Sequence, residues 1–275
     1  MGDQVQDRRP TVIVDDAHVT YRVQGVTAKG QVVGNDAVSA LRRMARRGPA
    51  PGVQYIKAVR GVSLVAYQGD AIGLIGRNGS GKSTLLQAMA GLLPIERGAI
   101  YTSAKPALLG VNAALIPQLT GERNIELGSL AMGLTPAQAV ERHDGIVEFS
   151  GLGEFVSYPM STYSSGMSAR LRFAISTSVT HDILLIDEAL ATGDAEFQRR
   201  SQDRIRELRG EAGTVFLVSH GAQIIRETCN RAIWLDGGQI VADGDVDDVV
   251  DMYEDHVKQQ LANRATGQST PTPKV

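Results

Sequence analysis

The stretch GRNGSGKST at residues 76–84 combines glycines, a lysine and hydroxyl side chains in a spacing that suits a polyphosphate. Gly76, Gly81, Lys82 and Ser83 satisfy the pattern G-x-x-x-x-G-K-[ST]. Glycines let the backbone curl so that several N–H groups point into one hollow, which the start of a following helix reinforces. Lys82 is expected to reach the β- and γ-phosphates of a nucleoside triphosphate, and Ser83 to ligate magnesium. The alternative, a glycine-rich turn with a surface lysine, does not explain the complete motif.

An acidic pair follows the apolar run ILLI further along the chain. Asp187 stands at the carboxyl end of that predicted strand, where it can support magnesium, and Glu188 comes next, where it can polarise an attacking water. Paired acids after a strand often only begin a loop or cap a helix. Downstream of a phosphate-binding motif, however, the pair favours hydrolysis of the bound nucleotide.

Two further polar sites lie at predicted element ends. Ser164 and Gly166 precede a predicted helix with an apolar stripe, in SSGMSARLRFAI. They form either a simple helix cap or a phosphate contact. His220 follows the apolar run TVFLVS, at the carboxyl end of a predicted strand, where sites of α/β proteins assemble. A purely structural histidine is the alternative.

The elements that must position these groups alternate between strands and helices. GVSLVAY and AIGLIG predict strands, and KSTLLQAMAGLL predicts a helix. The short apolar runs ILLID and TVFLVS are typical of strands buried on both faces. TVIVDDAHVTYRV predicts one strand leading into a second, and AIWLDGGQIVADG predicts a hairpin that turns at Gly237-Gly238. The alternation predicts an α/β fold.

The chain is expected to form one nucleotide-binding domain over residues 1–258. Residues 24–54 are expected to form a basic loop insertion with one short helix, and residues from about 119 to 170 a helical subdomain. The acid-rich segment from Asp243 to Asp255 predicts a solvated helix face, and residues 259–275 a flexible tail. The insertion carries basic residues that could meet anionic lipid headgroups or simply be solvated, namely Arg42, Arg43, Arg46 and Arg47.

Composition narrows the setting in which the protein works. The 275 residues carry a formal net charge of −2, which gives no general attraction to nucleic acid. The single cysteine, Cys229, rules out an intramolecular disulfide and fits a reducing compartment. No stretch approaches the roughly 18 apolar residues that a membrane-spanning helix needs. We therefore expect any work at a membrane to be done peripherally, on the cytoplasmic face of the cell membrane, with a partner.

Taken in order, these motifs resemble the nucleotide-binding domain of an ABC ATPase. Residues 76–84 match the Walker A motif, 183–188 the Walker B motif and 163–167 the signature loop, whereas ATGD ending at Asp194 matches the D-loop. The resemblance implies a P-loop NTPase fold, with a mixed sheet core, an antiparallel β part and a helical subdomain. It also implies ATP and Mg²⁺ as ligands, with Ser83 and Asp187 on the metal.

The resemblance assigns roles residue by residue. Glu188 and His220 correspond to the catalytic glutamate and the switch histidine, and Tyr21 resembles the aromatic that stacks on adenine, with Tyr55 in reserve. In this family two domains pair head to tail, so the signature loop acts on ATP held by the other subunit. The residues that contact the nucleotide are then Tyr21, Gly76, Arg77, Asn78, Gly79, Ser80, Gly81, Lys82, Ser83, Thr84 and Asp187, with Ser164, Ser165 and Gly166 reaching across the dimer.

Departures from the common motifs narrow the resemblance further. YSSGM replaces the usual LSGGQ, and no proline follows the glutamate in DEALATGD. These features are similar to the ATP-binding subunits of Wzt-type bacterial polysaccharide exporters, which move lipid-linked O-antigen, teichoic acid or galactan. Within that group the chain resembles the galactan exporter subunit of mycobacteria. The implied partners are a transmembrane permease pair, a second copy of this chain and, through the permease, the lipid-linked polysaccharide.

The sequence departs from the family pattern at the Q-loop. The position of the usual Q-loop glutamine is taken by residues 110–112, and Gln118 lies beyond Pro117.

The rival function is a soluble ABC ATPase acting on DNA or the ribosome. Such proteins usually carry two cassettes or a long coiled coil, whereas this chain has one P-loop and no long heptad run. We therefore expect no nucleic-acid partner.

Overall fold

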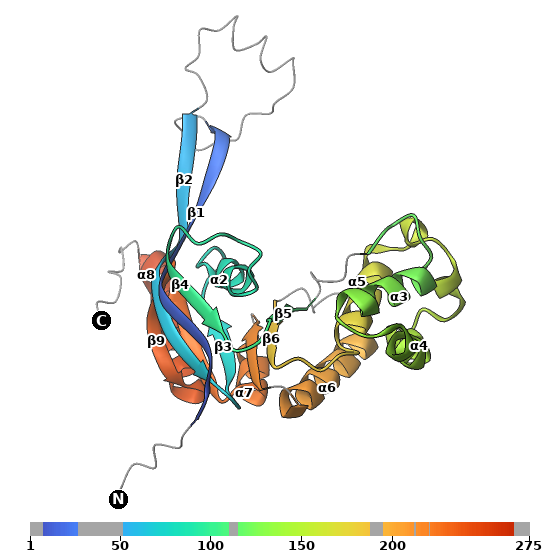
Figure 1. Cartoon of the computed structure of the whole chain (residues 1–275). Helices are drawn as coiled ribbons and strands as arrows, with labels where there is room; N and C mark the ends of the chain where they lie inside the picture. The colour runs from blue at the N-terminus through green and yellow to red at the C-terminus, as the bar shows by residue number, and fades with distance from the viewer. Residues whose placement is uncertain are drawn as a thin grey trace, which may run out of the picture.

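The computed structural model describes residues 8–26, 52–109, 115–187, 195–211, 213–219 and 221–266. These residues form two sheets and a helical lobe that projects to one side (Figure 1). The antiparallel sheet has the order β2–β1–β4, with β1 at Pro10–Val26, β2 at Gly52–Tyr67 and β4 at Arg97–Thr102. The larger sheet has the order β5–β6–β7–β3–β8–β9. Its strands are β3 (Ala71–Ile75), β5 (Ala107–Leu108), β6 (Ile183–Ile186), β7 (Thr214–Val218), β8 (Arg231–Asp236) and β9 (Gln239–Asp245). The predicted α/β class, with a mixed sheet and an antiparallel part, is confirmed.

The central strands of the larger sheet are buried throughout. Every residue of β3, β6 and β7 is buried, as expected for parallel strands covered on both faces. Because parallel strands end at the same edge, the residues that follow β3, β6 and β7 meet there. The loop beginning at Gly76, the carboxylate of Asp187 and the hydroxyl of Ser219 are therefore brought to one edge of the sheet.

The prediction of two strands near the N-terminus was wrong, because β1 is a single strand. Its pairing with β2 and β4 shifts register between Val14 and His18, where Asp16 has φ 43°. Partners on both sides keep β1 continuous through this bulge. β1 and β2 also include residues 24–26 and 52–54, so both ends of the predicted loop insertion are strand. The basic residues from Arg42 to Arg47 lie outside the described residues.

The helical lobe is formed by residues 121–176. It comprises α3 (Gly121–Ala131), α4 (Pro136–Ser150), the 3₁₀ helices η1 (Gly153–Ser157) and η2 (Met160–Thr162), and α5 (Ser165–Ser176). Threonines accept hydrogen bonds from the first turns of α3 and α4, and Thr135 forms a complete capping box with Gln138. Ile125, Ile146 and Leu171 form the core of this lobe.

The remaining helices cover the larger sheet. They are α2 (Lys82–Met89), α6 (Ala195–Glu211), α7 (Ala222–Thr228) and α8 (Val246–Thr266). β8 and β9 form the hairpin predicted at Gly237-Gly238. α8 continues past residue 258, where the sequence predicted the start of a tail. Its acids are not all simply solvated, because Arg226 of α7 forms ion pairs with Asp247 at 2.7 Å and Asp251 at 2.5 Å. Within the described ranges, no helix is both long and apolar enough to cross a membrane.

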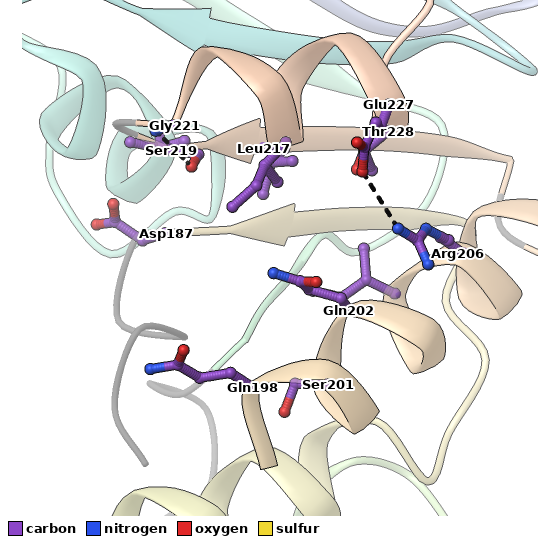
Figure 2. A pocket seen from close by; sticks show the side chains of 13 residues that line it. Asp187, Gln198, Ser201, Gln202, Arg206, Leu217, Ser219, Gly221, Glu227 and Thr228 are labelled. Carbon is purple, nitrogen blue, oxygen red and sulfur yellow. Dashed lines mark hydrogen bonds and ion pairs between the residues drawn. The ribbon is translucent and has the colours of Figure 1, made fainter. Parts of the chain in front are cut away.

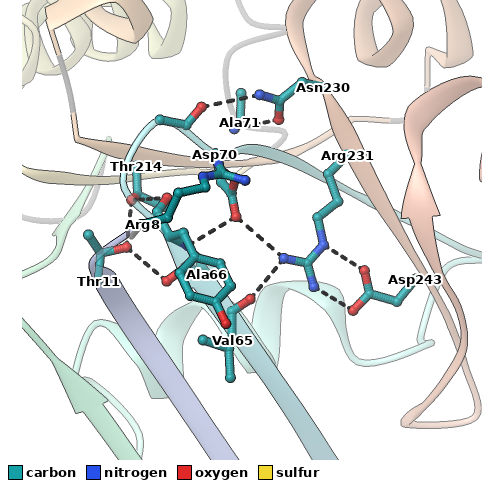
Figure 3. A network of polar contacts seen from close by, with 12 residues as sticks. Arg8, Thr11, Val65, Ala66, Asp70, Ala71, Thr214, Asn230, Arg231 and Asp243 are labelled. Carbon is teal, nitrogen blue, oxygen red and sulfur yellow. Dashed lines mark hydrogen bonds and ion pairs between the residues drawn. The ribbon is translucent and has the colours of Figure 1, made fainter. Parts of the chain in front are cut away.

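A polar network joins the two sheets around Asp70, at the turn between β2 and β3 (Figure 3). The Asp70 side chain is only 5% exposed and pairs with Arg8 and, at 3.4 Å, with Arg231. Arg231 also donates to the carbonyl oxygen of Val65 at 2.8 Å and to both carboxylate oxygens of Asp243 at 2.7 Å. The hydrogen bonds to Asp243, with the charges of both aspartates, raise the pKa of Arg231 against the effect of burial. One guanidinium thus ties β2, β8 and β9 together.

We expect Asp70→Asn to lower the free energy of unfolding by about 1–3 kcal/mol, because both arginines lose a buried charged acceptor. Urea unfolding followed by circular dichroism measures the change. Asp248→Asn, at an exposed position in the first turn of α8, is the matched control and should shift the midpoint far less, because it loses only a favourable contact with the helix dipole. Equal midpoints for the unchanged chain and Asp70→Asn would show that the network contributes nothing to stability.

Candidate nucleotide-binding site

The loop between β3 and α2 has a backbone that only glycine permits at two positions. Gly76 has φ 142°, and a Cβ there would lie 2.1 Å from the carbonyl oxygen of Leu235. Gly81 has φ 104°, and a Cβ there would lie 2.4 Å from the carbonyl oxygen of Ala58. Both contacts are far shorter than any real Cβ makes. The two glycines of the motif are therefore required by close backbone packing as well as by the turn itself.

The side chain of Lys82 packs against the backbone of this loop. Its side chain is 6% exposed, and Nζ donates to the carbonyl oxygens of Gly76 at 2.7 Å and Arg77 at 3.0 Å. Burial lowers the pKa of Lys82, and the nearby charge of Asp187 partly counteracts this effect. A buried cation held only by neutral carbonyl oxygens is electrostatically under-compensated. An anion at the mouth of the loop would supply the missing charge.

A pocket of about 290 Å³ opens in front of the loop. Its walls come from the loop, the start of α2 and the end of β7, namely Asn78, Gly79, Gly81, Lys82, Ser83, Thr84 and Val218. α2 begins at Lys82, and no side chain caps its N-terminus. Its first N–H groups therefore remain available, and the helix dipole favours negative charge there. The donor set suits a chain of phosphates.

Ser83 and Asp187 meet at the edge of this pocket. The hydroxyl of Ser83 donates to Oδ1 of Asp187 at 3.0 Å, across the ends of β3 and β6. The sequence predicted both residues as metal ligands, and the structure brings their oxygens together. Hydroxyl and carboxylate oxygens are the hard ligands that Mg²⁺ prefers.

Tyr21 of β1 reaches the same loop from the antiparallel sheet. Its hydroxyl lies 3.2 Å from Oγ1 of Thr84, and its side chain is 36% exposed. The reserve candidate, Tyr55, pairs with Arg22. Because neighbouring residues of a strand point to opposite faces, Tyr55 lies on the face away from Tyr21. The structure therefore favours Tyr21 as the aromatic beside the phosphate-binding loop.

Both predicted catalytic residues, Glu188 and His220, lie outside the described residues, as does Asp194 of the predicted D-loop. Their chain neighbours nevertheless share one pocket of about 260 Å³ (Figure 2). Asp187 lines it from the end of β6, and Ser219 and Gly221 line it beyond β7. α6 and α7 form the rest of the wall, where Arg206 and Glu227 pair at 3.3 Å. Asp187 and Ser219, the residues that precede Glu188 and His220, thus line the same pocket.

The predicted signature residues are not brought to the loop of their own chain. Ser164 caps α5 by accepting from the backbone N–H of Met167 at 3.1 Å, so the cap interpretation is realised. Ser165 begins α5, and Gly166 follows in its first turn. α5 belongs to the helical lobe, well apart from α2 (Figure 1). These three residues and Lys82 therefore do not form one site within a single chain.

The described residues around the predicted Q-loop position include Gln118 and Ile116. Residues 110–112, which replace the usual glutamine, lie outside the described residues. Gln118 is exposed in the turn before α3. Its neighbour Ile116 is instead fixed by Asn124, whose Oδ1 accepts from the Ile116 N–H at 2.7 Å.

Sequence reasoning missed the support that the β8–β9 hairpin gives to the phosphate-binding loop. The N–H of Gly238 donates to the carbonyl oxygen of Ser80 at 3.0 Å, and the N–H of Arg60 donates to Gly238 at 2.8 Å. The Gly237-Gly238 pair was predicted only as a turn. Nothing local in the sequence relates this turn to residues so far along the chain.

Comparison with known proteins agrees with this geometry. A protein-family model described as ABC transporter matches residues 59–191. The teichoic acids export ATP-binding protein TagH of Staphylococcus saprophyticus is 44% identical over 197 residues, covering 72% of this chain and 75% of that protein. The protein of the same name from Staphylococcus epidermidis is 42% identical over 201 residues, covering 73% and 76%. That from Bacillus cereus is 39% identical over 240 residues, which are 87% of this chain but only 43% of the relative.

Solved structures share the fold. The dimeric ATP-binding cassette MJ0796 in a post-hydrolysis state, bound to ADP and phosphate, has a TM-score of 0.65 at 20% identity, covering 86% of this chain and 98% of that one. An ATP-binding subunit of an ABC transporter has a TM-score of 0.66 at 21% identity, covering 89% and 93%. Identities of 20% and 21% to the solved structures establish only a shared architecture. Identities of 44% and 42% to the two Staphylococcus proteins establish common descent with them. The chain belongs to the ATP-binding proteins of ABC transporters, a family of ATPases.

Proposed function

We propose that this chain is the ATP-hydrolysing motor subunit of an exporter that moves a lipid-linked polysaccharide across the cytoplasmic membrane. The observation that carries the ATPase part is the meeting of Lys82, Ser83 and Asp187 at one sheet edge beside an open pocket. Lys82 neutralises phosphate charge, Tyr21 stacks on the adenine, and Glu188 polarises the attacking water. His220 acts beside it as the switch histidine that the family resemblance implies.

Mg²⁺ completes this proposed site. Ser83 and Asp187 supply two oxygens, and the described part of the chain offers no cluster of three or more His, Cys, Asp or Glu side chains that could hold an ion. Phosphate oxygens and water then provide the remaining ligands, as is usual for Mg²⁺ at nucleotides. When bound, the ion offsets the negative charge that develops on the phosphates.

A homodimer completes the site on its other side. Ser164, Ser165 and Gly166 lie on the lobe that is apart from α2, so they serve the nucleotide held by a second copy. Ser164 accepts from the N–H of Met167, and the other N–H groups in the first turn of α5 are offered to the phosphates there. ATP joins the two copies, and its hydrolysis separates them. The dimeric state of MJ0796 supports this arrangement by analogy of fold.

The transported class follows from the relatives. Several are named for teichoic acids export at about 40% identity, which favours polysaccharide export over an action on DNA or the ribosome. Among the polymers of this class we propose a galactan, because within the Wzt-type group the chain resembles the galactan exporter subunit of mycobacteria. The chain acts on the polymer only through its permease.

The permease pair binds the chain at the cytoplasmic face of the membrane. Two exposed aromatic side chains on the helical lobe support such a partner. Phe155 is 58% and Tyr158 is 55% exposed, and their ring centroids lie 6.2 Å apart. Adjacent exposed aromatic residues are typical anchors of protein interfaces.

Accumulation of the undelivered polymer tests this proposal. Cells of the source organism that carry Lys82→Ala in place of the unchanged chain are labelled with radioactive galactose, and their lipid-linked glycans are extracted and sized. We expect a galactose-labelled, lipid-linked polymer to accumulate because the motor no longer binds ATP. Accumulation of a polyol-phosphate polymer instead would correct the substrate to a teichoic acid. Absence of any accumulation would contradict export.

A further inference from the structure

The C-terminal helix α8 is fixed against the sheet by an aromatic cluster. Trp234 of β8 is 3% exposed and packs on Tyr253 at a centroid distance of 5.6 Å and on His256 at 4.9 Å. Val249 and Val250 of the same helix are buried in the core. The position and the rotation of α8 are therefore set by apolar packing.

One face of α8 continues from this cluster to the phosphate-binding loop. Residues 253, 256 and 260 are three and four apart and so lie on the same side of the helix. Nε2 of Gln260 lies 2.7 Å from Nε2 of His256, and Oε1 of Gln260 accepts from Nη1 of Arg77 at 3.0 Å. Since the amide nitrogen of Gln260 can only donate, the His256 contact orients the amide with its oxygen towards Arg77.

Arg77 is the residue through which this contact reaches the nucleotide site. Its carbonyl oxygen accepts from Nζ of Lys82 at 3.0 Å and from the N–H of Ser80 at 3.1 Å. Its side chain connects the loop directly to α8 through the hydrogen bond to Gln260. Restraining the Arg77 side chain restrains the peptide group on which Lys82 rests.

We propose that Gln260 is a positioning residue for ATP binding. α8 holds Arg77 in the conformation in which its carbonyl oxygen orients Lys82, so the C-terminal helix sets the affinity of the loop for phosphates. The inference rests on the proposed binding of ATP at Lys82 and is independent of the polymer transported. It gives α8 a role in the nucleotide site that the family's motifs do not assign.

The test compares variants of the full chain by calorimetric titration with ATP and Mg²⁺ and by steady-state hydrolysis. Gln260→Met keeps the length of the side chain and suits a helix, but it removes the acceptor. We expect it to raise the Kd and the KM for ATP about three- to tenfold, the range for one hydrogen bond, with kcat unchanged. Gln260→Glu keeps an acceptor oxygen for Arg77 and should bind ATP like the unchanged chain. Gln259→Met, at the exposed neighbouring position, is the matched control and should have no effect.

A double variant shows whether the effect passes through Arg77. In an Arg77→Met background, Gln260→Met should change the Kd by less than about twofold, because the shared contact is already lost. Three results would each overturn the proposal. The first is an undiminished effect of Gln260→Met in the Arg77→Met background, and the second is an unchanged Kd for Gln260→Met alone. The third is a Gln260→Glu variant that binds ATP as weakly as Gln260→Met. Lys82→Ala, measured alongside, distinguishes a failure of the proposed ATP site from a failure of the positioning role. If it binds ATP normally, the proposed site itself fails, whereas loss of ATP with an unaffected Gln260→Met refutes only the positioning role.

Discussion

Replacing Lys82 with alanine is expected to weaken ATP binding by about 100-fold or more. The variant removes a buried cation whose charge-assisted hydrogen bonds to phosphate contribute about 1.5–3 kcal/mol each, and Nζ can make two or more of them. Two backbone carbonyl oxygens of the loop hold the same Nζ at the pocket, and neither carries the formal charge that phosphate oxygens supply. Calorimetric titration of the purified chain with ATP and Mg²⁺ measures the loss.

Lys105→Ala provides the matched control for that experiment. Lys105 is an exposed lysine outside the lining of the loop pocket, and its removal should leave ATP binding unchanged. Circular dichroism must show that both variants remain folded. Equal affinity of Lys82→Ala and the unchanged chain would contradict the assignment of the pocket in front of Gly76–Thr84 to phosphates.

Glu188→Gln is expected to retain ATP and to lower the rate of hydrolysis by about 10²–10⁴-fold, the usual contribution of a general base. The amide keeps the size of the side chain but cannot take a proton from the attacking water. Because ATP then persists between two copies, the variant should also run as a dimer in gel filtration with ATP and as a monomer without it. Phosphate release and the elution volume are the two readouts.

Glu196→Gln tests whether the effect is specific to position 188. Glu196 lies in the first turn of α6, close in sequence, and its replacement carries the same change of charge. It should hydrolyse ATP at the normal rate and form no ATP-dependent dimer. An unchanged rate in Glu188→Gln would refute its assignment as the base, and a slow rate in both variants would indicate a general effect of charge.

The local parts of the site could be predicted from the sequence because their residues are contiguous. The loop from Gly76 to Thr84 is one motif, and its geometry follows from glycine conformations and the start of α2. The approach of Asp187 to Ser83 required only one more rule, that parallel strands end at a common edge. Both predictions depend on short-range pattern and on sheet topology, which the buried runs of β3 and β6 reveal.

The parts that could not be predicted depend on balances between distant groups. Asp15 and Asp16 are poor strand residues, yet β1 continues through them because β2 and β4 pair with it on both sides. Residues from 259 onward are polar enough to predict a tail, but QQLANR also favours helix and extends α8 to Thr266. The contact between Gln260 and Arg77 depends on the packing of α8 against Trp234, for which no local signal exists.

The most direct test of the motor assignment is an ATP-dependent pull-down from native membranes. Tagged Glu188→Gln protein is added with ATP to detergent-solubilised membranes of the source organism, Lys82→Ala serves as the control that does not bind ATP, and the recovered proteins are identified by mass spectrometry. We predict that a polytopic membrane protein is recovered together with glycan-assembly enzymes, and that Glu188→Gln with ATP retains it best. Recovery of DNA-repair or ribosomal proteins alone would leave the ATPase site standing and contradict the role in export.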